Sequence, residues 1–188
     1  MILIPLTDPL TDDQLVDRVK NGDTRAFEDL VLRHQKGIYY FVLRILQNQS
    51  DAEDTVQKIF LLAFQNLKGF RAESSFKTWL YRIGINQCNN LIRQNRKREY
   101  TSIEELPLAD LRPDQERDLS EKERSTQIQK AVERLPYKQR MVVTLRIYQE
   151  LSFEEIGAAL QIRANSAKVN FHHAVEKIKK WINPEATP

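Results

Sequence analysis

Basic and aromatic side chains alternate between residues 66 and 98, a pattern that could hold single-stranded nucleic acid. This segment has eight Lys and Arg residues and a single acidic one, Glu73, for a net charge of +7. Aromatic residues interleave with these bases: Phe70, Phe76, Trp79 and Tyr81. Aromatic faces stack on bases that have left a duplex, and hydrogen bonds read the edges of those bases. The block is therefore a candidate surface for unpaired DNA.

One base could occupy a pocket made by the loop of residues 70–75 and Asn86, which lies seven residues after Trp79 and shares its helical face. The alternative is that the aromatic residues are simply core, and we prefer it for Phe76, Leu80 and, for the most part, Trp79. Phe70 and Asn86 are less easily explained in this way. An Asn within a helix is a poor helix former unless it has a partner.

A helix-turn-helix is predicted near the end of the chain. Residues 151–160 form a short helix with small residues at 157–159 that allow a close crossing, and a turn of about four residues leads into a longer helix. The polar start of that helix carries side chains that can reach base edges in a major groove: Arg163, Asn165, Ser166 and Lys168. Lys177, Lys179 and Lys180 are better placed for phosphates. The alternative is a plain antiparallel helix pair.

Enzyme chemistry is not expected. Asp51 and Asp54 stand in a first helical turn, where acids favour the helix dipole, and no nucleophile, metal ligand set or glycine-rich phosphate loop accompanies them. Gln57, on the same side, could meet a protein partner. His172 and His173 diverge by about 100° on a helix and cannot face one ion. We therefore expect no catalytic residue, no metal site and no cofactor.

The elements that must position these residues are helices, because helical periodicity dominates and no convincing strand alternation occurs. Capping boxes mark four expected helix starts: Thr11–Gln14, Ser50–Glu53, Ser120–Glu123 and Ser152–Glu155. We expect an all-α fold of two small helical domains, residues 1–98 and 120–188, the second containing the helix-turn-helix. A flexible linker, residues 99–119, contains two prolines and many acids.

Composition narrows the class of protein. The 188 residues are 41% apolar and 29% charged, which argues against full disorder, and one cysteine, Cys88, excludes a disulfide framework and fits a reducing cytosol. No apolar run approaches the ~18 residues of a membrane span, and the N-terminus has no signal-peptide core. We expect a cytoplasmic protein without membrane insertion. Residues 161–180 carry a net +4, so two basic blocks flank an acidic stretch.

Several motifs, in order, resemble the bacterial extracytoplasmic-function sigma factors, the two-domain group of the sigma-70 family. The resemblance spans about residues 11–182. Its motifs are residues 51–60, residues 74–83 with Asn86, Leu135-Pro-x-x-x-Arg140, and Leu151-Ser-x-x-Glu-Ile156. The resemblance implies a specificity subunit that binds core RNA polymerase, through the β′ clamp helices and the β flap, and directs it to promoter DNA.

The resemblance also implies roles for individual residues. The polymerase contact would lie on Asp51, Asp54 and Gln57. The minus-10 element would be captured by the loop of Phe70, Arg71 and Ser74 with Asn86, and the strand backbone would be followed by Lys77, Arg82, Arg93 and Arg96. The minus-35 element would meet Arg163, Asn165, Ser166, Lys168, Asn170, His173 and Lys177. Members of this group are commonly held inactive by an anti-sigma factor.

Two departures from the family pattern bear on these roles. Lys58 stands where Glu is usual after Gln57, and residues 169–175 have lost or weakened three basic positions of the last helix. Fewer phosphate contacts lower both the affinity for DNA and its salt dependence.

Two other functions are open on the residues alone. One is a stand-alone helix-turn-helix regulator, which needs neither the aromatic–basic block nor the Asp51–Phe60 helix. The other is a nucleic-acid enzyme.

Overall fold

The protein is described from a computed structural model, in which residues 10–99 and 119–182 are described. Within these ranges the regular elements are all helices and no strand occurs, so the predicted all-α class is confirmed. The predicted linker lies almost entirely outside the described residues, and so do the side chains of Ser120 and Glu123. None of the helices in the two described ranges is both long and apolar enough to cross a lipid bilayer.

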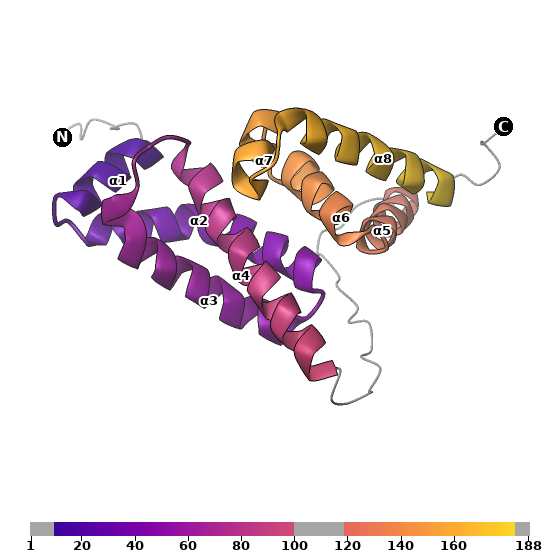
Figure 1. The fold of residues 1–188 in the computed structure, drawn as a ribbon, viewed down its shortest axis with the longest axis horizontal. Coiled ribbons are helices and arrows are strands. Elements are labelled where there is room, and N and C mark those ends of the chain that lie inside the picture. The colour runs from indigo at the N-terminus through magenta and orange to yellow at the C-terminus, as the bar shows by residue number, and fades with distance from the viewer. Residues whose placement is uncertain (1–9, 100–118, 183–188) are drawn as a thin grey trace, which may run out of the picture.

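The first four α-helices form one bundle (Figure 1). Three long helices lie against one another, and a short one crosses their end. Their bounds are α1 (Asp12–Lys20), α2 (Arg25–Leu46), α3 (Gln49–Asn66) and α4 (Phe76–Glu99), with the 3₁₀ turn η1 (Leu67–Gly69) after α3. Leu30, Phe41, Ile59 and Leu80 are fully buried between them. Burial of this apolar face gives the bundle its stability.

The remaining helices form a second, smaller group (Figure 1). They are α5 (Leu119–Glu133), α6 (Tyr137–Val143), the π-helical turn η2 (Thr144–Tyr148), α7 (Phe153–Leu160) and α8 (Ala164–Ile182). A small core of Val132, Leu135, Val143 and Ala174 joins α5, α6 and α8. In the two described ranges, four α-helices therefore lie on each side of residues 100–118, as predicted for these segments.

The local start signals are confirmed at two of the predicted capping boxes. At Thr11 and at Ser152 the hydroxyl accepts from the backbone N–H three residues on, and the Gln14 or Glu155 side chain accepts from the cap's own N–H. The prediction at Ser50 is wrong, because Asn48 caps α3 instead: its Oδ1 accepts from the Asp51 N–H at 2.9 Å. Asn is at least as good a cap as Ser, so the helix starts earlier.

The two groups of helices pack against each other through α2 and α4 on one side and α6, η2 and α7 on the other. Buried Met141, Leu145 and Ile156 belong to the same apolar cluster as Phe41 and Leu80. We call this contact the interdomain interface. It places the short first helix of the helix-turn-helix, α7, directly on α4, the helix of the basic and aromatic block.

Candidate nucleic-acid interface

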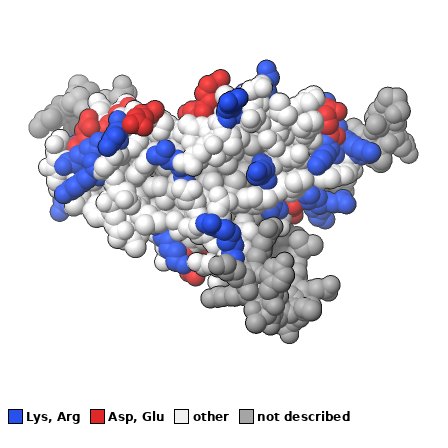
Figure 2. Space-filling model, viewed as in Figure 1, with Lys and Arg blue, Asp and Glu red and all other residues white. Residues whose placement is uncertain are grey.

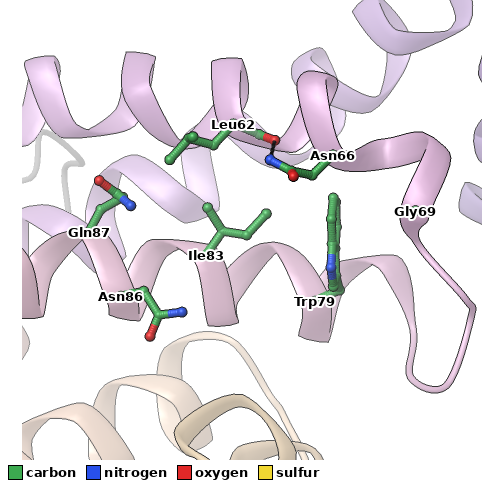
Figure 3. A pocket seen from close by; sticks show the side chains of 7 residues that line it. All are labelled: Leu62, Asn66, Gly69, Trp79, Ile83, Asn86 and Gln87. Atoms are coloured by element: carbon green, nitrogen blue, oxygen red, sulfur yellow. Dashed lines mark hydrogen bonds between the residues drawn. The ribbon is translucent and has the colours of Figure 1, made fainter.

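A pocket of about 380 Å³ opens between α3 and α4. Trp79, Ile83, Asn86 and Gln87 line it from α4, and Leu62 and Asn66 from α3, with Gly69 at the end nearest the 70–75 loop (Figure 3). Pockets of 300–1,000 Å³ hold small organic ligands. The site combines an indole ring with three amide side chains, which can each donate and accept a hydrogen bond. This open pocket is therefore a candidate site for a single nucleobase.

Phe70 does not belong to that pocket, and the interpretation of Phe70 as something other than a core residue is wrong. Its side chain is only 5% exposed, and its ring centroid lies 5.0 Å from that of Trp79 and 6.3 Å from that of Phe76. Lys20 of α1 fixes the same residue by donating from Nζ to its backbone oxygen at 2.6 Å. The ring is buried because α4 begins beside it, a tertiary contact that the sequence pattern does not contain.

Asn86, in contrast, is exposed at the mouth of the pocket. Arg82, Asn86 and Arg93 lie within about 40° of one another around α4, because their spacings approach whole turns of 3.6 residues. Arg82 is half-buried and Arg93 is exposed. These three side chains form one polar stripe along α4, which we call the α4 stripe. The side chain of Arg96 lies outside the described residues.

Lys77 lies on a different side of α4, about 140–180° from the α4 stripe. Its Nζ donates to the backbone oxygen of Gln149 at 2.7 Å, across the interdomain interface. The structure therefore separates Lys77 from the other basic residues with which the sequence grouped it. In the 70–75 loop, Arg71 is exposed and Ser74 is half-buried, and Ser75 caps α4 by accepting from the Thr78 N–H at 3.1 Å.

The helix-turn-helix prediction is confirmed: α7 ends at Leu160 and α8 begins at Ala164. Gly157 makes the tight turn possible, since a Cβ there would lie 2.8 Å from the backbone oxygen of Ile162. Ala159 is buried, whereas Ala158 is exposed and takes no part in the crossing. Gln161 closes α7 with a left-handed φ of 56°.

The predicted minus-35 residues do not share one face of α8. Ser166, Asn170, His173 and Lys177 lie within about 60° of one another, whereas Lys168 is about 140–180° away from them around the helix. Ser166, Lys168 and His173 are exposed, as are Arg163 in the turn and Asn165 in the first helical turn. Asn170 also donates to the Ser166 backbone oxygen at 2.8 Å.

Val169 was missed by the sequence reasoning. Its side chain is 46% exposed and lies between Ser166 and Asn165 around the helix, opposite the buried face of Ala167 and Ala174. An exposed valine suits contact with a thymine methyl group in the major groove. The sequence did contain a signal for this exposure, because Val169 is an apolar residue that lies off the apolar stripe of α8.

A second exposed face lies on α3, and it extends the acidic motif further than the sequence suggested. Asp54, Gln57, Leu61 and Phe64 fall within about 80° of one another around the helix. All four are exposed, Leu61 by 57% and Phe64 by 42%. Asp51 is half-buried at the edge of this group, which we call the α3 face. Its mixed polar and apolar character is typical of protein interfaces.

Neither metal nor thiol chemistry has a site in the described ranges. No group of three or more His, Cys, Asp or Glu side chains within residues 10–99 and 119–182 is arranged to hold an ion. Burial raises the pKa of Cys88 to about 12, so its thiol stays protonated and unreactive at neutral pH.

Basic side chains lie over both groups of helices on the face shown in Figure 2.

Two family models match the chain. The model described as Sigma-70 region 2 matches residues 30–98, and the one described as Sigma-70, region 4 matches residues 125–178. The first covers most of α2, all of α3 and most of α4, and the second contains the helix-turn-helix. The candidate pocket and the α4 stripe fall within the first match.

Curated relatives align along nearly the whole chain. The RNA polymerase sigma-H factor of Pseudomonas aeruginosa is 32% identical over 183 residues, covering 92% of this chain and 94% of its own. The ECF RNA polymerase sigma-E factor of Escherichia coli K12 is 33% identical over 189 residues, covering 95% of this chain and 98% of its own.

Solved structures share the fold. The sigma factor RpoE of Bartonella quintana, in complex with the anti-sigma factor NepR, superposes with a TM-score of 0.75 at 20% identity, over 86% of this chain and 99% of that one. CnrH in complex with the cytosolic domain of CnrY gives a TM-score of 0.68 at 23% identity, over 92% of this chain and 97% of that one.

Proposed function

We propose how the two helical domains of this chain divide promoter recognition between them. The chain belongs to the extracytoplasmic-function sigma factors of the sigma-70 family and acts as a specificity subunit of RNA polymerase. Residues 1–98 form the domain that binds core polymerase and opens the minus-10 element. Residues 120–188 form the domain that reads the minus-35 element, and residues 99–119 link the two. The alternative of a stand-alone helix-turn-helix regulator is not favoured, because it has no use for the first domain.

The pocket between α3 and α4 is the observation that carries this assignment. One base of the minus-10 element leaves the duplex and enters the pocket, where the exposed Asn86 offers an amide and the Trp79 ring, only 8% exposed, forms part of the wall. Arg82 and Arg93 of the α4 stripe and Arg71 of the loop then hold the phosphates of the same strand. An enzyme active site is not needed, since the polymerase performs the chemistry.

The α3 face is the proposed contact with the β′ clamp helices. Asp54 and Gln57 supply polar contacts there, and Leu61 and Phe64 supply the apolar area that a stable contact requires. Lys58, which departs from the family pattern, is exposed beside Gln57 and alters the charge of this contact. The second domain is proposed to bind the β flap.

At the minus-35 element, α8 enters the major groove of the DNA. Ser166, Val169 and His173 lie at the centre of its exposed surface and face the bases, while Lys168 on one flank and Asn170 and Lys177 on the other approach the two phosphate backbones. Arg163 and Asn165 contact DNA from the turn. Because the substrate is promoter DNA in a polymerase complex, we place the protein in the cytoplasm.

An anti-sigma factor is the proposed regulatory partner. The solved structure of RpoE of Bartonella quintana contains the anti-sigma factor NepR, and that of CnrH contains the cytosolic domain of CnrY. The exposed apolar residues of the α3 face offer such a partner a surface that competes with polymerase.

Replacing Asn86 by Ala tests the pocket. Loss of one base-edge contact costs roughly 1–3 kcal/mol, so the fraction of open complexes formed by the holoenzyme at limiting concentration should fall about 5- to 160-fold, while its affinity for core polymerase stays unchanged. Promoter opening is measured by permanganate reactivity of unpaired thymines.

The matched control is Gln94→Ala, which removes an exposed amide from α4 outside the pocket. This variant should open promoters as the wild type does. If Asn86→Ala lowers core binding as much as opening, Asn86 is a structural residue and the proposed pocket is wrong.

A further inference from the structure

We infer that Lys20, in the last turn of α1, is a positioning residue for capture of the minus-10 strand. It holds the start of the 70–75 loop on the bundle, so that the loop has its DNA-binding shape before DNA arrives. The inference deepens the proposed function and rests on it, because it concerns the loop beside the candidate pocket. The Sigma-70 region 2 match begins at residue 30, so α1 lies outside it.

The end of α1 lies beside the start of the loop. This helix contacts η1, the turn that leads into the loop, and also α4, the helix that follows it (Figure 1). Leu15, Val16 and Val19 bury one side of α1 in the core of the bundle. Lys20 follows Val19 directly and is half-buried. The packed helix therefore presents the lysine to the loop from a fixed support.

The turn after Lys20 is held by several bonds. The Asp23 N–H donates to the Arg18 backbone oxygen at 3.0 Å, and Arg18 Nε donates to Asp23 Oδ2 at 2.9 Å. Gly22 within this turn has a left-handed φ of 100°, which glycine adopts without strain. These contacts fix the end of α1 that carries Lys20.

Lys20 makes two contacts with Phe70, which lies 50 residues further along the chain. Its Nζ donates to the Phe70 backbone oxygen at 2.6 Å and lies 5.5 Å from the centre of the Phe70 ring. The Phe70 N–H donates in turn to the Leu67 backbone oxygen of η1 at 3.1 Å. Both backbone polar groups of Phe70 are thus engaged, and its buried ring packs on Trp79.

The loop is fixed at both ends and exposed between them. Ser75 holds the far end by accepting from the Thr78 N–H at 3.1 Å. Arg71, Ala72 and Glu73 are exposed, and Ala72 has a left-handed φ of 55°, which is uncommon for a residue with a Cβ. Such a conformation persists only where the flanking structure holds it. A loop that is already ordered loses less conformational freedom when DNA binds, and the binding is tighter.

Two simpler roles for Lys20 make different predictions. A cation in the last turn of a helix favours the helix dipole, but that role needs no contact with Phe70 and affects only stability. A lysine that binds a phosphate directly would, when removed, lower the salt slope of DNA binding by about 1. The positioning role instead predicts weaker binding of the minus-10 strand with an unchanged salt slope.

Two variants of Lys20 and one control separate these roles. Lys20→Met removes the cation and the donor but keeps a long apolar side chain, whereas Lys20→Arg keeps both the charge and a donor. The matched control is Lys36→Met, which removes an exposed cation from α2. All three variants should keep the helicity of the wild type and its affinity for core polymerase, because neither lysine belongs to the α3 face.

Hydrogen–deuterium exchange of the free full-length chains measures the loop itself. In Lys20→Met the amides of residues 70–75 should exchange faster than in the wild type, while those of α2 and α3 keep their wild-type rates. Lys20→Arg and Lys36→Met should match the wild type throughout.

Holoenzymes made with each variant are then titrated with a labelled single strand at two salt concentrations. The strand carries the minus-10 sequence of a promoter that depends on this chain, and a scrambled strand is the reference. Lys20→Met should weaken binding of the minus-10 strand about 3- to 10-fold, the range expected for one hydrogen bond at a half-exposed site. Its affinity for the scrambled strand and its salt slope should not change, and Lys20→Arg should restore most of the lost affinity.

Four results would overturn the role of Lys20. They are minus-10 binding by Lys20→Met as tight as that of the wild type, a loss that lowers the salt slope by about 1, an equal loss on the scrambled strand or in Lys20→Arg, and unchanged exchange of residues 70–75. Failure of the proposed function has a different signature. Wild-type holoenzyme would then bind the minus-10 and scrambled strands equally, whatever the exchange rates of the loop are.

Discussion

His34 is a residue whose protonation opposes folding. It lies on α2 with Nε2 2.7 Å from Asp12 Oδ2 and its ring 5.5 Å from that of Phe76. Burial lowers the pKa of His34, and this effect outweighs the opposite influence of Asp12. The folded protein therefore binds this proton only at a pH below the ordinary 6.5, whereas the unfolded chain binds it near 6.5.

From this sign we predict that stability falls as pH is lowered through 6.5, because the unfolded state then binds more protons than the folded one. The contribution of one such group is at most about 1.4 kcal/mol per pH unit. Urea unfolding at pH 7.5, 6.5 and 5.5 measures it. The His34→Gln variant should lose much of this dependence of stability on pH. The His173→Gln variant, at an exposed site, should keep it. Equal slopes of stability against pH for the wild type and His34→Gln would refute the role of His34.

Single residues also show where sequence reasoning succeeds. The caps at Thr11 and Ser152 were predictable because each depends on a partner three residues away. Phe70 and Lys77 were not, because Phe70 is buried by Trp79 and Lys77 is held by Gln149, 72 residues along the chain. A pattern within one segment contains no information on such contacts.

Among the elements, α3 serves two surfaces. Leu62 and Asn66 line the pocket, while Leu61 and Phe64 project from the α3 face. We predict that Leu61→Asp weakens binding to core polymerase at least 10-fold, because it places a charge in an apolar contact, and leaves helicity unchanged. Fluorescence anisotropy of labelled protein titrated with core measures the affinity.

The control for this variant is Leu32→Asp on α2, an apolar side chain that is 67% exposed. It introduces the same charge on another helix and should bind core as the wild type does. A loss of affinity as large for Leu32→Asp as for Leu61→Asp would mean that the α3 face is not the specific contact.

The other decisive element is α8, whose faces are proposed to separate base reading from phosphate binding. Lys168→Ala should weaken transcription by a similar factor for all minus-35 sequences and reduce the salt slope by about 1. Val169→Ser should instead change the preference at one base position, because it removes an apolar contact from the centre of the exposed surface. A library of minus-35 sequences transcribed at two salt concentrations distinguishes the two.

The reverse pattern, with Lys168→Ala altering base preference and Val169→Ser altering only salt dependence, would contradict this orientation of α8.

The existence of the helix-turn-helix was predictable from the Ser152 cap and Gly157, both local signals. Its orientation was not, since Lys168 and Ser166 are near in sequence but lie on different sides of the helix.

On the scale of the whole molecule, the number and order of the helices followed from periodicity, but their packing across the interdomain interface did not. In the sequence, Gln149 looks like an ordinary polar surface residue between two helices. In the structure its side chain is buried. Only the three-dimensional structure brings it to Gly37, Tyr81 and Lys77. The charge pattern, with two basic blocks flanking an acidic stretch, is consistent with two DNA contacts made by separate domains.

The central claim is that one chain guides core polymerase by contacting a promoter at two separated elements. Start sites that depend on the chain are mapped by sequencing transcripts after overexpression, and one such promoter is then footprinted with purified core, with and without the protein. Protection centred near minus 10 and minus 35, with permanganate-reactive thymines only near minus 10, is the predicted result. Tight binding to a duplex operator by the chain alone, with no new start sites and no effect of core polymerase, would contradict it.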